Sequence, residues 1–212
     1  MNAHAEFDRQ VDTLIQKGYP ELAGLSVEGF LKYVNPLKEK LMESSLPELD
    51  IQGGTLPFTI VINSELVDTQ KMMSRVNREG KQGLTKLHPH EPKDFAPIDT
   101  VTIPDGMAYF LVNIDRGKQT LNITPHDALQ MIQMENRSPL TINEGVALVT
   151  HFPEFLIKNN CFSLLASRHS GDKRVPAIWI NSHKEPNLGW CWNGNPHTWL
   201  GSASCEKRIG AQ

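Results

Sequence analysis

Apolar residues recur at helical spacing through residues 1–45, and this pattern constrains the fold more than any other feature of the chain. The clearest set lies at positions i, i+4, i+7 and i+8 and consists of Phe7, Val11, Leu14 and Ile15. It predicts an amphipathic helix that ends at Gly18. Ser26 is expected to cap a second helix, and Pro36 can open a third that runs through Met42.

The apolar pattern changes after the Gly53-Gly54 pair. Residues 56–62 are apolar and β-branched, as in a buried strand, and residues 66–76 return to helical spacing. Residues 77–97 combine glycines, prolines and charges with little periodicity. We interpret this stretch as a flexible loop and as the candidate boundary within an otherwise single domain of residues 1–212.

The second half of the chain predicts a mixture of strands and helices. Residues 100–103 and 108–114 read as a hairpin whose turn is residues 104–106. Thr124 is expected to cap a helix that runs through about Met134.

Thr141 and Glu144 form a capping box for a further helix. Short strands are expected at residues 161–166, 177–180 and 189–192. The predicted class is α+β, with a helical N-terminal part packed on a mixed or antiparallel sheet and a strand-rich C-terminal half.

Composition narrows the classes of partner. The formal net charge is −3, from 21 basic and 24 acidic side chains spread along the chain, so nucleic-acid binding is not expected. No apolar run approaches the roughly 20 residues that span a bilayer, and the N-terminus does not resemble a secretory signal. Three cysteines, an odd number, indicate free thiols and a cytoplasmic protein.

The segment GWCWNGNPHTW at 189–199 is the densest polar and aromatic cluster and holds three of the four tryptophans. In a strand, Trp190 and Trp192 share one face and Cys191 takes the other. The two rings could form a stacking platform for a flat ligand, or they could close the core. The candidate ligand-binding residues here are Trp190, Trp192, Asn193, Asn195 and Trp199.

Cys191 and His197 could form a thiolate and base pair, as in a cysteine-dependent hydrolase or transferase. Cys205 is the alternative nucleophile, and an inert packed thiol is the competing interpretation. The same residues with Cys161 lack the paired C-x-x-C spacing of structural zinc sites, so no metal site is assigned.

Two further groups of polar residues lie in predicted loops. His88 and His90 offer a weak chelating pair, for which a solvated loop is the better interpretation. The turn at 167–174 can present cations and backbone N–H groups to an anion, and so can the turn at 115–117. Exposed turns with weak salt bridges are the alternative. If the turns meet beside the Trp segment, the resulting ion-pair network would involve Asp115, Arg116, Arg168, Asp172 and Arg174.

Four segments together resemble a bacterial family of uncharacterised proteins, a domain of unknown function with the C-terminal signature GWCWxGNPHTWLG. They are NIDRGKQTLNITPHDAL at 113–129, SPLTINEGVALVTHFPE at 138–154, SRHSGDKRVPAIWI at 167–180 and GWCWNGNPHTWLGSASC at 189–205. The resemblance implies no activity, cofactor or catalytic residue.

The leading functional hypothesis is a domain that binds a small anionic or aromatic molecule, or a partner, at a site lined by Trp and Arg side chains. A cysteine and histidine-dependent enzyme is the alternative, and recognition of a partner by residues 77–97 is the third. The sequence leaves both the cofactor and the oligomeric state unknown.

Overall fold

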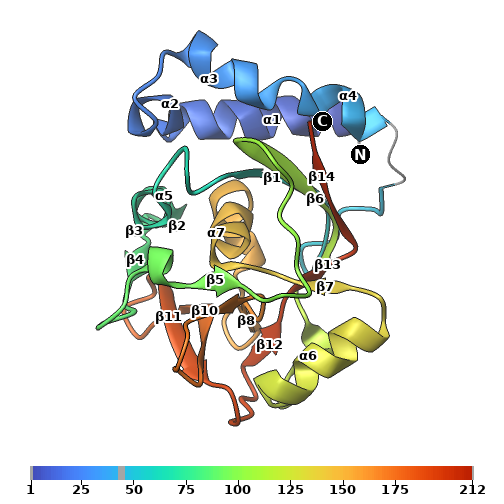
Figure 1. The fold of residues 1–212 in the computed structure, drawn as a ribbon, viewed down its shortest axis with the longest axis vertical. Coiled ribbons are helices and arrows are strands. Elements are labelled where there is room, and N and C mark those ends of the chain that lie inside the picture. Colours follow the sequence, from blue (N-terminus) through green and yellow to red (C-terminus); the bar gives the residue numbers. More distant parts are fainter. Residues whose placement is uncertain (1, 43–45, 212) are drawn as a thin grey trace.

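The computed structural model describes residues 2–42 and 46–211, which contain the following elements (Figure 1). The helices are α1 (Ala3–Gln16), α2 (Tyr19–Leu22), α3 (Val27–Val34), α4 (Leu37–Met42), α5 (Thr69–Arg75), α6 (Pro125–Met134) and α7 (Ile142–His151), with short 3-10 helices η1 (Pro92–Asp94), η2 (Lys118–Thr120) and η3 (Pro153–Phe155). The strands are β1 (Thr55–Ile62), β2 (Asn77–Arg78), β3 (Lys81–Gln82), β4 (Leu84–Thr85), β5 (Ala96–Pro97), β6 (Ala108–Asp115), β7 (Ser138–Pro139), β8 (Cys161–Ser163), β9 (Ser167–Arg168), β10 (Arg174–Ile180), β11 (Pro186–Trp192), β12 (Leu200–Ser202), β13 (Ser204–Cys205) and β14 (Lys207–Gly210).

The first four helices form a layer at one end of the molecule, above β1, β6 and β14 in Figure 1. Their boundaries follow local signals. The side chain of Asn2 accepts hydrogen bonds at the start of α1, and Gly18 adopts a φ of 75° just after it. The Ser26 side chain accepts a hydrogen bond from Gly29 N at the start of α3. The predicted helical N-terminal part is therefore confirmed over residues 2–42, whereas residues 1 and 43–45 of that prediction lie outside the described residues.

Two five-stranded sheets follow, one antiparallel and one mixed. The first has the order β1-β6-β13-β7, with β14 also paired to β6, and all of its pairs are antiparallel. The second has the order β12-β8-β10-β11-β4, in which β11 with β4 and β12 with β8 are parallel. Helix α7 contacts β1 of the first sheet and β10 of the second. Every residue of α7 except Asn143 is buried, as expected of a helix enclosed on all sides. The predicted α+β class is confirmed.

The predicted hairpin between residues 100–103 and 108–114 is wrong. Only its second half is a strand, β6, and residues 100–103 form none. β6 pairs along one edge with β1 and along the other with β13 and β14. Both edges are thus occupied by segments distant in sequence, so no edge is left for a local hairpin partner.

Residues 77–97 are more structured than the flexible loop that we expected. β2 pairs with β3, β4 adds to β11, and β5 pairs with β9. Leu87 and Phe95 are buried in the main core. Strands of two residues have no periodicity to read, and the partners of β4 and β5 lie about 70–100 residues further along the chain. The single-domain organisation, with its candidate boundary here, stays a prediction.

The later helices confirm their predicted caps. Thr124 Oγ1 accepts a hydrogen bond from Asp127 N before α6, and Thr141 and Glu144 form the capping box of α7. The strand expected at 161–166 is only the three-residue β8, while β10 and β11 begin earlier than expected. Within residues 2–42 and 46–211, no helix has the length and apolar character needed to cross a membrane.

Candidate functional site

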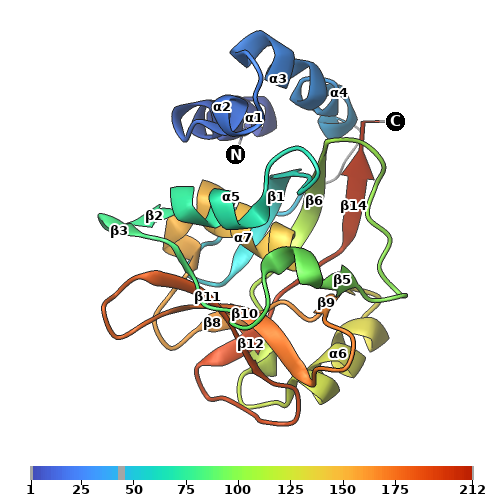
Figure 2. The ribbon, with the colours of Figure 1, turned by 60° about the vertical axis from the view of Figure 1, so that its left-hand side comes forward.

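An open depression of about 550 Å³ lies where the end of β11 meets the N-terminus of α6 and the turn between β9 and β10. Figure 2 shows this turn beside α6. We call this open depression the Trp192 depression. Its lining residues are Thr124, His126, Asp127, Arg168, Asp172, Lys173, Trp192, Asn193 and Gly194. Two groups of residues that the sequence analysis singled out separately, in the Trp segment and in the 167–174 turn, therefore meet here.

Backbone hydrogen bonds through Asn193 hold the three segments together. Asn193 N donates to Lys173 O at 3.0 Å, and His126 N donates to Asn193 O at 3.1 Å. The second bond fixes the first turn of α6 against the end of β11. The Oδ1 atom of Asn193 is buried and has no hydrogen-bond partner among the described residues. An orphaned acceptor of this kind is uncommon in folded proteins.

Arg168 brings a cation without a counter-ion to the depression. The only hydrogen bond of its side chain within the described residues runs from Nη1 to the neighbouring Ser167 O at 3.1 Å, and the side chain forms no ion pair there. Burial lowers the pKa of Arg168 to about 10, because the charged form is penalised when water is removed. The group is still a cation at neutral pH, and it is costly to leave unpaired.

Trp192 offers an aromatic surface in the same depression. It is 49% exposed, which makes it one of the few large apolar side chains on the described surface. The N-terminus of α6, which carries a partial positive charge, forms another part of the wall through Thr124 and Asp127. The Asp127 carboxylate accepts a hydrogen bond from the Thr124 hydroxyl at 2.8 Å, so it is already engaged within the chain.

Trp190, unlike Trp192, is packed. The Arg174 guanidinium carbon lies 3.3 Å from the centre of the Trp190 ring, a cation–π contact. Arg174 also donates to Asp172 at 2.7 Å. This bond to Arg174 lowers the pKa of Asp172 to about 2. The two rings therefore do not form a joint platform, because Arg174 covers Trp190.

The 77–97 segment contributes to this packing. The His90 ring stacks on that of His169 with centroids 3.8 Å apart, and its edge faces Trp190 at 5.4 Å. Phe95 completes the cluster at 6.1 Å from Trp190. His88 remains exposed, as a solvated loop residue would. In the described part of the chain, no group of three or more His, Cys, Asp or Glu side chains is arranged to hold a metal ion.

Cys191 and His197 do not form a hydrogen-bonded pair within the described residues. β11 runs through Trp190, Cys191 and Trp192 as predicted, so the thiol points away from the two rings. Burial raises the pKa of Cys191 to about 11. The His197 ring lies against Trp199 at 5.2 Å, and Trp199 packs on Trp179. This environment disfavours the thiolate that nucleophilic chemistry requires.

The other two cysteines are also buried as free thiols. Burial raises the pKa of Cys205 to about 12 and also raises that of Cys161. Neither thiol lines the Trp192 depression. The environments of all three cysteines therefore oppose thiolate formation.

The turn at 115–117 is placed elsewhere, so the hypothetical ion-pair network with the 167–174 turn does not form. Arg116 is fully buried, and it donates to the backbone carbonyls of Ile51, Gln52 and Phe155. Asp115 accepts a hydrogen bond from Gly117 N at 2.6 Å. Of the network, only the Arg174–Asp172 ion pair is present in the described residues.

The sequence did not reveal that α6, Lys173 and Gly194 contribute to the depression. Asn195, a candidate from the sequence, is exposed and does not line the depression. The missed lining residues are Thr124, His126, Asp127, Lys173 and Gly194. The cap at Thr124 was recognised from its pattern, and a helix N-terminus is a known place for anions. That signal could have placed α6 on the list of candidates.

Comparisons with known proteins give a family but no activity. Neither the curated proteins nor the solved structures contain a match to this chain. One family model covers nearly the whole chain, including the segments that form the Trp192 depression. By this match over residues 13–211, the chain belongs to a family of unknown function, DUF5701.

Proposed function

We propose that the protein binds a small molecule that carries both an anionic group and a flat ring, and that it does so in the Trp192 depression. The observation that carries this proposal is the pairing of an uncompensated guanidinium, Arg168, with an exposed ring, Trp192, in one depression. Specific pockets commonly combine apolar surface with a few convergent polar groups.

Each part of the depression supports one feature of the ligand. A carboxylate or phosphate would pair with Arg168, whose planar fork suits two-point contacts with such anions. The Trp192 ring would stack on an aromatic or heteroaromatic group.

The acids in the depression do not oppose an anion strongly. Asp172 is paired with Arg174, and the Asp127 carboxylate is bonded to the Thr124 hydroxyl. Lys173 adds a further cation to the wall. The proposal retains the expectation of a bacterial, cytoplasmic protein, which is supported by the family resemblance and by three free cysteines.

Thermal-shift screening followed by calorimetry tests the proposal. The compounds are mononucleotides and indole carboxylates, with inorganic phosphate and neutral indole as matched compounds that lack one feature. We expect compounds with both features to raise the melting temperature, and Arg168→Met and Trp192→Ala each to weaken binding by about tenfold or more.

Two variants control for nonspecific effects. Lys158→Met removes an exposed cation and Tyr33→Ala removes an exposed ring, both outside the depression. Neither should change binding. The proposal fails if no compound with both features stabilises the protein at millimolar concentration, or if Arg168→Met binds as tightly as the parent chain.

A further inference from the structure

A second cavity, of about 380 Å³, lies on the other side of the two-residue strand β9. Ser167 of β9 lines this cavity, whereas the next residue, Arg168, lines the Trp192 depression. The remaining walls come from the loop after β1, the start of α5, the η1–β5 segment, β6 and the N-terminus of α7. We name it the Tyr109 pocket.

Apolar groups supply much of the wall of the Tyr109 pocket. They are Pro92, Phe95, Pro97, Ile103 and Ile142, together with the ring of Tyr109. Phe95 and Ile142 are buried parts of the main core, so the wall is held in place by packing. Such a wall suits the apolar body of a small ligand.

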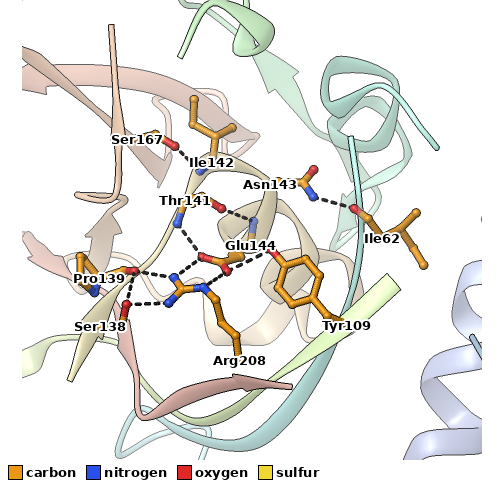
Figure 3. Close-up of polar contacts among 10 residues, drawn as sticks. All are labelled: Ile62, Tyr109, Ser138, Pro139, Thr141, Ile142, Asn143, Glu144, Ser167 and Arg208. Atoms are coloured by element: carbon orange, nitrogen blue, oxygen red, sulfur yellow. Dashed lines mark hydrogen bonds and ion pairs between the residues drawn. The ribbon is translucent and has the colours of Figure 1, made fainter. Parts of the chain in front are cut away.

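The polar groups beneath this wall are already paired (Figure 3). Tyr109 donates to Glu144 Oε1 at 3.0 Å, and Arg208 binds both oxygens of the same carboxylate. Ile142 N donates to Ser167 Oγ at 2.9 Å. The buried Glu144 also offsets the partial positive charge at the start of α7. The floor therefore favours no anion.

Charged side chains occur at the mouth, and their balance is negative. The cation, Lys93, is paired with Glu91 at 2.6 Å. The carboxylate of Glu65 has no hydrogen bond or ion pair within the described residues. Asp68 accepts a hydrogen bond from Lys71 N through Oδ1, and its Oδ2 has no hydrogen bond or ion pair among the described residues, although its charge contributes to the raised pKa of Lys93. Two acidic residues with uncommitted carboxylate oxygens therefore line the pocket.

We propose that the Tyr109 pocket is a second ligand site, which takes a small organic amine with an apolar body. The ammonium group lies at the mouth between Glu65 and Asp68, and the apolar body packs on Phe95 and Ile103. This charge preference is opposite to that of the Trp192 depression, so the two sites are distinguishable by ligand charge.

Isothermal titration of the full-length Arg168→Met variant, which lacks the cation of the Trp192 depression, with three matched compounds tests the charge preference. The compounds are phenethylamine, its alcohol analogue 2-phenylethanol and its acid analogue phenylacetate, which share a ring and differ in the polar group. We expect saturable binding of phenethylamine at millimolar concentration and weaker or no binding of the other two. The proposal is overturned if phenethylamine does not bind or if either analogue binds as tightly.

Substitutions locate the binding. We expect the double variant E65Q/D68N to weaken phenethylamine binding by about five- to tenfold, in keeping with ion pairs at a solvent-exposed rim. Asn at position 68 still caps α5, and Glu65→Gln alone provides a variant without any change at a cap. Glu28→Gln removes an exposed acid on α3 and should have no effect.

Two further variants separate this site from the Trp192 depression. Ser64→Trp places a large ring at the exposed rim of the Tyr109 pocket and should abolish phenethylamine binding. Arg168→Met should leave it unchanged. Unaltered binding in Ser64→Trp and in E65Q/D68N, or loss of binding in Arg168→Met, would place the amine elsewhere and overturn the assignment.

Discussion

The side chain of Arg208 is buried and that of Arg168 is half-buried, and their environments are opposite. Arg208 is 6% exposed and makes charge-assisted hydrogen bonds to both Glu144 oxygens, at 2.6 and 2.9 Å, and another to Pro139 O. The Arg168 side chain has one hydrogen bond within the described residues, to the carbonyl of the neighbouring Ser167, and no ion pair there.

The pKa values of the two guanidinium groups reflect this difference. Burial acts to lower both, and at Arg168 it brings the pKa to about 10. At Arg208 the charge and hydrogen bonds of Glu144 outweigh burial, and the pKa rises. One region is thus closed, with its charges satisfied by the chain. The other is open, with a charge that has no counter-ion among the described residues.

The largest expected effect comes from breaking the closed region. Arg208→Met leaves the Glu144 carboxylate buried without its cation, and we expect it to lower the free energy of unfolding by ~3–5 kcal/mol. Arg168→Met removes a half-buried charge that has no ion pair, so we expect any loss of stability to stay below ~0.5 kcal/mol. Urea denaturation of both variants measures this difference. Equal losses of stability would contradict the distinction between the two arginines.

A smaller effect is expected on the pH dependence of stability, through the buried His151. His151 is 3% exposed and shares a hydrogen bond between Nε2 and Ile60 O. Burial, aided by the charge of Arg9, lowers the pKa of His151 from 6.5 to about 3. The unfolded chain therefore takes up a proton near pH 6.5 that the folded chain refuses until about pH 3, and stability falls as the pH drops through this window.

The parent chain and His151→Gln isolate this contribution. Glutamine cannot titrate and can still donate to Ile60 O. We expect the stability of the variant to fall less steeply below pH 6.5, by up to about 1.4 kcal/mol per pH unit. The measurement is urea denaturation at a series of pH values between 7 and 4. Parallel stability curves for the two proteins would show that His151 is not held neutral.

The features predicted correctly from sequence depend on short-range physics. The Thr124 cap and the Thr141–Glu144 capping box involve residues three apart, so their pattern is visible in the sequence itself. The alternation along β11 is likewise local. It places Cys191 on the opposite face of the strand from Trp190 and Trp192 without reference to any tertiary contact.

The features that sequence reasoning missed depend on long-range contacts. β12, β13 and β14 are two to four residues long, and they form only because distant strands supply their partners. Nothing in the sequence distinguishes the fully buried Arg116 from the pocket-lining Arg168. The hydrogen bond from His126 N to Asn193 O, which brings α6 to the site, is equally invisible.

The smallest expected effects come from substitutions of two tryptophans in β11, Trp190 and Trp192. They test whether one ring is packed within the protein while the other is open. Trp190 packs against Arg174, His90 and Phe95. We expect Trp190→Ala to cost ~1–2 kcal/mol of stability, less than the ~3–5 kcal/mol of a fully buried aromatic residue.

Trp192→Ala removes a ring that is 49% exposed, so we expect its stability to change by no more than ~0.5 kcal/mol. Its binding of anionic aromatic compounds should be lost. Urea denaturation and calorimetry on the two variants measure both quantities. A large loss of stability in Trp192→Ala would mean that this ring serves packing as Trp190 does. The open region would then have Arg168 as its cation and no aromatic surface reserved for a ligand.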